Sequence, residues 1–114
     1  MKYLMYADEV DWQAHPAGHP GVEMKILRSQ KDFTYKESIA FVRIAVGGAV
    51  LPHVHEEEDD NLYILSGRAK MRVGNEKFDI GPEAQITVPA GMEHEIFDVV
   101  EEILFYDVFA PRIF

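Results

Sequence analysis

The chain has 114 residues, of which 47% are apolar, so length and composition predict a single domain, residues 1–114, with one ordinary core. The formal net charge is −9, from 11 basic and 20 acidic residues, which argues against nucleic acid or an anionic membrane surface as a partner. The sequence has no cysteine, which excludes disulfides and thiolate catalysis and leaves nitrogen and oxygen as the ligands of any metal site.

The amino-terminal region predicts a cytoplasmic protein. Residues 1–9 lack the apolar core of a signal peptide, and no run in the sequence is long enough to span a bilayer. Residues 3–28 are predicted to form an edge strand, a loop and then a strand over Val22–Arg28. The loop carries His15 and His19, which have no periodic partner, so we interpret both as solvated loop residues and not as ligands.

Residues 38–46 are apolar on both alternating faces, as is typical of a strand in the wall of a sandwich or barrel. Arg43 is the one charged residue of this strand, and two interpretations of it stay open. It lies at an edge or pairs with a surface acid, or it shares an inward face with Phe41 and binds a substrate carboxylate. The second interpretation makes Arg43 a catalytic candidate and Phe41 a substrate contact.

The stretch 47–67 contains two histidines with metal-ligand spacing. Residues two apart on a strand share one face, so His53 and His55 can direct both imidazoles at a common point. The acidic run 56–60 follows at once and would attract a cation. Asp59 and Asp60 face opposite ways on a strand, so only one of them can point inward.

The rest of the chain continues as strands. Residues 68–73 and 77–80 form a predicted hairpin, and short strands are expected over Gln85–Val88 and 94–100. The last of these begins at His94, after a tight turn. Three imidazoles and the Asp60 carboxylate would suit a divalent transition metal such as Zn, Fe, Mn, Ni or Cu.

The final predicted strand, 103–109, places one acid among aromatic residues. Phe105, Asp107 and Phe109 share a face. A buried carboxylate without a partner is costly, so Asp107 either turns to solvent or has a chemical role inside. In the second case it is a candidate general acid or base. Strands that recur with turn signals between them, and no helix of useful length, predict an all-β sandwich or barrel.

At these residues the sequence resembles the cupins. The first cupin motif is matched by Gly47, His53, His55, Asp60 and Gly67. The second is matched by Pro89, Gly91 and His94, with Asp98 where the family usually has Asn. Two departures are Asp60, where the family usually has Glu, and Glu83, where the motif has glycine.

The resemblance implies a cupin jelly roll of two antiparallel sheets, with a metal held by the three histidines inside the barrel. Asp60 is one methylene shorter than the usual Glu, so it ligates directly only if its strand moves inward; otherwise a water bridges it, or the histidines bind alone. Small cupins also commonly dimerise through their amino-terminal strands. Tyr3, Leu4 and Tyr6 would cover such an edge, which favours a homodimer.

The carboxyl-terminal sequence 107–112 resembles the tail of small single-domain cupins associated with pectin and uronate breakdown. That likeness implies that Asp107 and Phe109 line the pocket, with Phe105 beside them and Arg112 orienting an anionic group. The first functional hypothesis is a metal-dependent enzyme that uses the ion as a Lewis acid on a small oxygenated metabolite, such as a sugar acid undergoing isomerisation or ring closure. The alternatives are an iron-dependent dioxygenase, a non-catalytic module that binds a metal or a sugar, and a jelly roll with vestigial histidines.

Overall fold

The computed structural model describes residues 3–32 and 36–114 and is built almost entirely of strands. One 3-10 turn, η1, spans Ala7–Glu9. Eight strands follow in the described residues: β1 (Gln13–Ala14), β2 (Val22–Arg28), β3 (Ser38–Ile44), β4 (Val50–His53), β5 (Asp59–Val73), β6 (Glu76–Ile80), β7 (Gln85–Val88) and β8 (His94–Ala110). The predictions of strands over Val22–Arg28 and Gln85–Val88 are confirmed.

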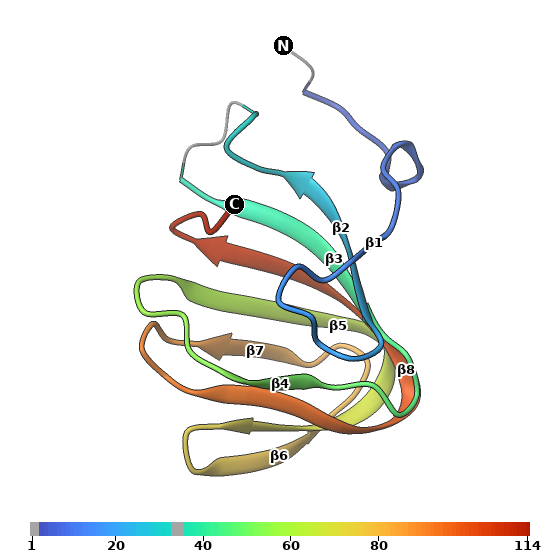
Figure 1. Ribbon diagram of the computed structural model, residues 1–114, viewed down its shortest axis with the longest axis vertical. Helices are drawn as coiled ribbons and strands as arrows, with labels where there is room; N and C mark the ends of the chain where they lie inside the picture. The colour runs from blue at the N-terminus through green and yellow to red at the C-terminus, as the bar shows by residue number, and fades with distance from the viewer. Residues whose placement is uncertain (1–2, 33–35) are drawn as a thin grey trace.

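Two long bent strands, β5 and β8, hold the structure together (Figure 1). They pair with each other along most of their length, from Asp59 opposite Ala110 to Val73 opposite His94. The carboxyl-terminal half of β8 also pairs with β3, and its amino-terminal end pairs with β4. In the same way, β5 pairs with β7 at its start and with β6 at its end. All of these pairings are antiparallel, and the prediction of an all-β jelly roll is confirmed.

The residues expected to form two strands at 94–100 and 103–109 form the single strand β8, and its inward face changes phase along the way. His94 and Asp107 are both buried, although they are an odd number of positions apart. A regular strand would direct them to opposite faces. Asp98 interrupts the alternation with a φ of 49°, a left-handed conformation that Asp and Asn tolerate better than most residues. Both side chains therefore face the same interior.

The strand β5 makes a matching change of phase next to Gly67. Asp60 and Leu62 face inward before this point, and Ala69 and Met71 face inward after it. Gly67 has a φ of 95°, and a Cβ at this position would overlap the carbonyl oxygen of Glu102 on β8. Only glycine permits this close approach of the two bent strands. The bends let β5 and β8 contribute to both sheets and close the barrel.

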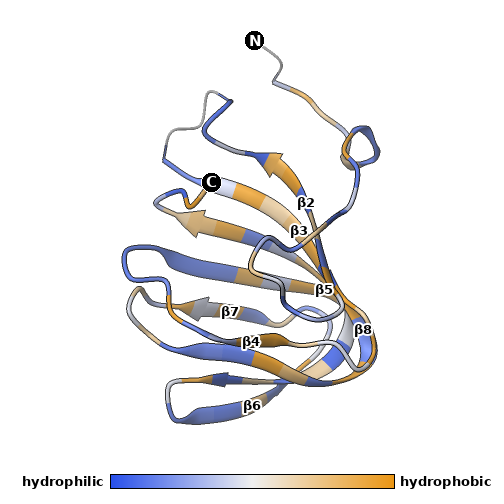
Figure 2. Ribbon diagram, viewed as in Figure 1, coloured by the Kyte–Doolittle hydropathy of each residue, from blue (hydrophilic) through white to orange (hydrophobic). Residues whose placement is uncertain are grey.

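The core lies between the sheets and is aliphatic. Its largest fully buried side chains come from β3, β5 and β8, and include Ile44, Ile64, Met71, Ile96 and Ile103. Hydrophobic segments recur along β2, β3 and β4, whereas the connecting loops are largely hydrophilic (Figure 2). The barrel is thus closed by ordinary hydrophobic burial, and the polar residues found inside it need a separate explanation.

The predicted amino-terminal edge strand is wrong. Residues 3–6 form no strand, and the first strand is the two-residue β1, which pairs with β2 inside the segment that we expected to be irregular. Tyr3, Leu4 and Tyr6 are nevertheless exposed, so a homodimer through this region stays a prediction. Within the described residues, no helix has the length and apolar character needed to cross a membrane.

Candidate metal centre

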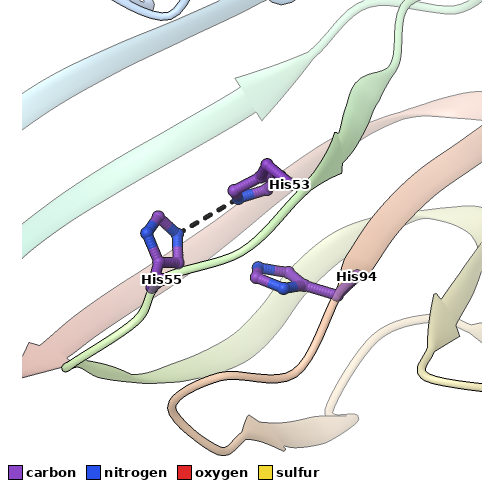
Figure 3. Close-up of side chains that lie close together, drawn as sticks. All are labelled: His53, His55 and His94. Atoms are coloured by element: carbon purple, nitrogen blue, oxygen red, sulfur yellow. Dashed lines mark hydrogen bonds between the residues drawn. The ribbon is translucent and has the colours of Figure 1, made fainter.

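Three histidines from two adjacent segments converge inside the barrel (Figure 3). His53 ends β4, His55 follows it in the next loop, and His94 begins β8, where it is the cross-strand partner of His53. One ring nitrogen from each histidine lies within 4.8 Å of the other two. The Nε2 atoms of His53 and His55 are 3.1 Å apart. Two nitrogens bound to one ion at about 2.1 Å each would be separated by about 3 Å, so this pair matches metal ligation.

Backbone carbonyls determine which nitrogens of the triad are available. The Nδ1 atom of His53 is 2.8 Å from the carbonyl oxygen of Leu51, and Nδ1 of His94 is 3.0 Å from that of Met92. A carbonyl only accepts, so each Nδ1 carries the proton and each Nε2 keeps its lone pair. Nε2 of His94 is buried and has no hydrogen-bond partner among the described residues. An ion between the three rings would satisfy it, and the residues present therefore fit a metal.

Burial also keeps two of these imidazoles neutral, which is the form that binds a metal. Desolvation lowers the pKa of His53, and it lowers the pKa of His55 to about 4 with a further contribution from the neighbouring His53. Protons therefore compete weakly for these nitrogens at neutral pH.

Asp60 lies beside the triad. Its side chain is buried, with 5% of its surface exposed, and Oδ2 is 3.6 Å from Nε2 of His94 and 4.0 Å from Nε2 of His55. Asp59 faces outward and accepts a hydrogen bond from the backbone N–H of Ala90 at 2.9 Å. The preference for Asp60 over Asp59 as the inward acid is confirmed, whereas direct ligation by Asp60 stays a prediction.

The side chain of Asp107, on β8, faces the same interior and is only 3% exposed. Desolvation raises the pKa of Asp107 well above its usual range, and the negative charge of Asp60 and a hydrogen bond with that carboxyl raise it further. Phe105 and Phe109 line the cavity on either side of it, as the sequence predicted. The ring of Phe109 meets the edge of His55 at a centroid distance of 5.4 Å.

The three other predicted site residues, Arg43, Phe41 and Arg112, do not line this cavity. Arg43 lies on the outer face of β3, where Nη2 is 2.8 Å from Oε1 of Glu23 and the guanidinium stacks over the ring of Trp12. The surface-pair interpretation of Arg43 therefore holds. Phe41 shares this outer face because the inward positions of β3 are the even-numbered ones. Arg112 donates a hydrogen bond to Gln30 at 3.0 Å.

The interpretation of His15 and His19 as solvated loop residues is wrong. The hairpin between β1 and β2 folds them over the triad, so that His19 is buried with its ring centroid 5.2 Å from that of His53. Nδ1 of His19 accepts the backbone N–H of Leu51 at 3.0 Å. The carbonyl oxygen of Leu51 also accepts a hydrogen bond from Nδ1 of His53. His19 therefore helps to fix the position of the residue that orients the His53 ring. No periodicity in the sequence marks these two histidines.

The cavity that contains these groups has a volume of about 300 Å³. It is lined by His15, the triad, Asp60 and Asp107, together with aliphatic and aromatic side chains. The volume lies at the lower end of the range for ligand pockets, about 300–1,000 Å³, so it suits a small molecule.

Fold and site together define a small jelly-roll barrel with a three-histidine candidate metal centre inside. The sequence matches the family model of the cupin domain over residues 40–108, which is more than half of the chain. The chain therefore belongs to the cupin family. Glu83, which replaces the motif glycine, retains the glycine-like backbone conformation with a φ of 72°.

Two relatives share part of this sequence. The uncharacterized protein MJ1618 of Methanocaldococcus jannaschii is 34% identical over 64 residues, which cover 56% of this chain and 51% of that protein. The match thus spans about half the length of MJ1618. The uncharacterized protein SCO3923 of Streptomyces coelicolor is 26% identical over 98 residues, covering 78% of this chain and 90% of that protein.

Several solved structures have the same fold. KdgF from Halomonas sp. superposes with a TM-score of 0.84 at 24% identity, covering 98% of this chain and 96% of that one. A "predicted oxalate decarboxylase" from Thermotoga maritima gives 0.83 at 23% identity, with coverages of 95% and 98%. The polyketide cyclase RemF from Streptomyces resistomycificus gives 0.82 at 18% identity, with coverages of 96% and 80%. At these identities the likeness establishes the fold alone.

Proposed function

We propose that this protein is a metal-dependent enzyme that acts on a small oxygenated metabolite inside the barrel. The convergence of His53, His55 and His94, one ring nitrogen from each within 4.8 Å of the others, is the observation that carries this proposal. Two features support it further: the Nδ1 hydrogen bonds that leave Nε2 free on His53 and His94, and the buried carboxyl of Asp107 in the same cavity.

The three histidines would hold the ion through their Nε2 atoms, and Asp60 would complete the site directly or through a water. A divalent metal bound there would act as a Lewis acid on a carbonyl or hydroxyl oxygen. Zn, Fe, Mn, Ni and Cu all suit this donor set. Asp107 is the proposed proton carrier, because desolvation favours its protonated form and thereby poises the carboxyl to exchange a proton with a substrate. An isomerisation or ring closure would use these two functions together.

The sugar acid suggested by the carboxyl-terminal resemblance has weaker support than the metal chemistry. KdgF, a fold relative, shares this architecture, but Arg43 and Arg112 contact Glu23 and Gln30 and do not line the cavity. We therefore propose the reaction type and leave the substrate at the level of a small oxygenated molecule.

The proposal is tested by metal titration combined with proton exchange. Metal-free protein is titrated with Zn²⁺, Mn²⁺ and Fe²⁺ by calorimetry, and the loaded forms are then incubated in D₂O with hydroxyacetone, whose deuteration is followed by NMR. We expect binding of one ion per chain and faster deuteration than with the metal-free protein. Asp107→Asn should slow this exchange by about 10²- to 10⁴-fold and leave one ion bound.

A binding module without turnover is the second candidate, favoured by one observation. The Asp60 carboxyl approaches the triad no closer than 3.6 Å in its ion-pair contacts, which is compatible with a weaker site used only for capture. If one ion binds with no exchange above the metal-free rate for any of the three metals, the binding module replaces the enzyme. If no metal binds, both candidates fail.

A further inference from the structure

We propose that the cavity takes a neutral, mostly apolar molecule that carries a hydroxyl group, such as a phenol or a cyclic enol, in preference to a sugar acid or another carboxylate. This inference deepens the proposed function, because it names the substrate class of the same cavity. It is carried by the charges, hydrogen-bond acceptors and side chains that line the cavity.

Among the described residues, 3–32 and 36–114, no lysine or arginine lines the cavity. The arginines point elsewhere: Arg43 pairs with Glu23, and Arg112 contacts Gln30. Recognition of a carboxylate in an apolar site needs a guanidinium, an ammonium or a set of N–H donors, because desolvating an unpaired anion is very costly.

The cavity already contains two acids. Asp60 and Asp107 are 5% and 3% exposed, so both carboxyl groups are buried. An anionic ligand would bring a further negative charge beside them, and no lysine or arginine of the described residues lines the cavity to compensate it. A metal at the triad would compensate only the ligand oxygen bound to it, so a charged group elsewhere on the ligand would remain unpaired.

Most of the remaining wall is hydrophobic. Aliphatic side chains of β2, β3 and β5 form one part of it, and Phe105, Phe109 and Phe114 form another. The rings of Phe109 and Phe114 meet edge to face at a centroid distance of 5.7 Å. A ligand ring can bury its faces and edges against such aromatic side chains, whereas a polyhydroxylated sugar would lose hydrogen bonds to water without replacing them.

Two unsatisfied carboxyl oxygens favour a hydroxyl group on the ligand, because a hydroxyl can both donate and accept a hydrogen bond. Oδ1 of Asp60 and Oδ1 of Asp107 are buried and have no hydrogen-bond partner among the described residues. Buried acceptors in folded proteins almost always find a donor. A ligand hydroxyl can donate to one of these oxygens and present its own oxygen to the ion, and a carboxylate has no proton to donate.

Two probes of nearly identical shape test the proposal. 4-Hydroxyacetophenone and 4-hydroxybenzoate differ by a methyl group in place of a carboxylate oxygen, and galacturonate represents the sugar acids. Their binding to the metal-free and Zn²⁺-loaded full chain is measured by NMR titration. We expect 4-hydroxyacetophenone to bind at least about tenfold more tightly than either acid in both forms. Equal or tighter binding of either acid in either form, or no binding of 4-hydroxyacetophenone, overturns the proposal.

Acetophenone tests the role of the hydroxyl. It should bind more weakly than 4-hydroxyacetophenone by about tenfold, because a buried acceptor then stays unpaired. Equal affinities would refute hydroxyl recognition by Asp60 and Asp107.

A charge placed at the edge of the cavity tests the electrostatic part. Phe114 lines the cavity and is partly exposed, so Phe114→Arg adds a guanidinium at the cavity edge, and Phe114→Leu controls for the lost packing against Phe109. We expect Phe114→Arg to reduce the ratio of the affinities for 4-hydroxyacetophenone and 4-hydroxybenzoate by at least about threefold. The Phe114→Leu variant should still bind 4-hydroxyacetophenone more tightly than 4-hydroxybenzoate. An unchanged ratio in Phe114→Arg would contradict the proposal. Zn²⁺ titration reports on the proposed function separately, since the neutral probe can bind metal-free protein even if the triad holds no ion.

Discussion

The inner and outer faces of the barrel use charged residues in different ways. On the outside, Arg72 contacts Glu93 and Glu95 at 2.7 and 2.6 Å, and Arg43 pairs with Glu23. On the inside, Asp60 and Asp107 face the histidines, and no lysine or arginine of the described residues lines the cavity beside them. The outer charges are satisfied by their partners, and such surface pairs contribute only modestly to stability. The inner polar groups are desolvated, and several of their atoms lack a hydrogen-bond partner among the described residues. Shifted pKa values and ligand binding are typical of such groups.

The largest effect should follow from removing an inner ligand. His53→Ala or His94→Ala removes one of three nitrogens and should lower Zn²⁺ affinity by at least about 100-fold, measured by calorimetry. His15→Ala is the matched control, because His15 lines the same cavity but lies outside the three-histidine group. A His53→Ala protein that binds Zn²⁺ as tightly as the wild type would place the ion elsewhere.

Neutralising the inner acid should stabilise the metal-free protein at neutral pH. The folded-state pKa of Asp107 is raised, so the folded state holds this proton more tightly than the unfolded chain does. The free energy of unfolding then falls as pH rises from about 4 through the folded-state pKa. Asp107→Asn should remove this loss and gain about 1–3 kcal/mol at pH 8, with little gain at pH 4, by urea denaturation.

The control for this prediction is Asp79→Asn, since Asp79 is an exposed acid on β6 with a side chain that is 85% accessible. We expect this variant to change stability little at either pH. An Asp107→Asn protein that is less stable than the wild type at pH 8 would mean that the carboxylate form is the one favoured by folding.

The pH dependence of metal binding should also reflect burial. The pKa of His55 is lowered to about 4 and that of His53 is lowered too, so protons should compete with the ion only at acidic pH. Because His55 gains its proton only near pH 4, Zn²⁺ affinity should still be falling between pH 5.5 and about 4, as followed by calorimetry in a series of buffers. An affinity that has already reached its acidic limit at pH 5.5 would mean that the rings of His53 and His55 are solvated.

The smallest effect is expected on the outer face. Arg43→Ala removes an ion pair with Glu23 and a cation–π contact with Trp12, and should lower the free energy of unfolding by about 1 kcal/mol. Zn²⁺ affinity and 4-hydroxyacetophenone affinity should stay the same. Arg43→Lys keeps the charge and should recover part of the stability. Loss of ligand affinity without loss of stability would mean that Arg43 faces the cavity.

Much of the fold and the centre of the site could be predicted from the sequence. Alternation identified β2 and β7, and the sequence indicated His53, His55 and His94 as the group that the structure brings together. Strand alternation paired His53 with His55 and placed Asp107 with Phe105 and Phe109, because local periodicity is recorded directly in the sequence. The addition of His94 and the choice of Asp60 over Asp59 came from the resemblance to the cupin motifs.

The features that sequence reasoning missed depend on long-range geometry. The two interpretations of Arg43 placed it on opposite faces of an equally apolar strand, and only closure of the barrel decides between them. His15 and His19 reach the site because a hairpin folds over it, and no pattern in that loop signals the contact. The bend near Asp98 changes the phase of β8, so the relation of His94 to Asp107 could not be obtained by counting residues.

X-ray absorption spectroscopy of the Zn²⁺-loaded protein tests the central claim most directly, because it reports the atoms bound to the ion. The account predicts three imidazole nitrogens at about 2.0–2.1 Å, with any further ligands being oxygens. In the His94→Ala protein the number of imidazoles should fall to two or the ion should be lost. A wild-type spectrum with no more than one imidazole would contradict a metal centre formed by His53, His55 and His94.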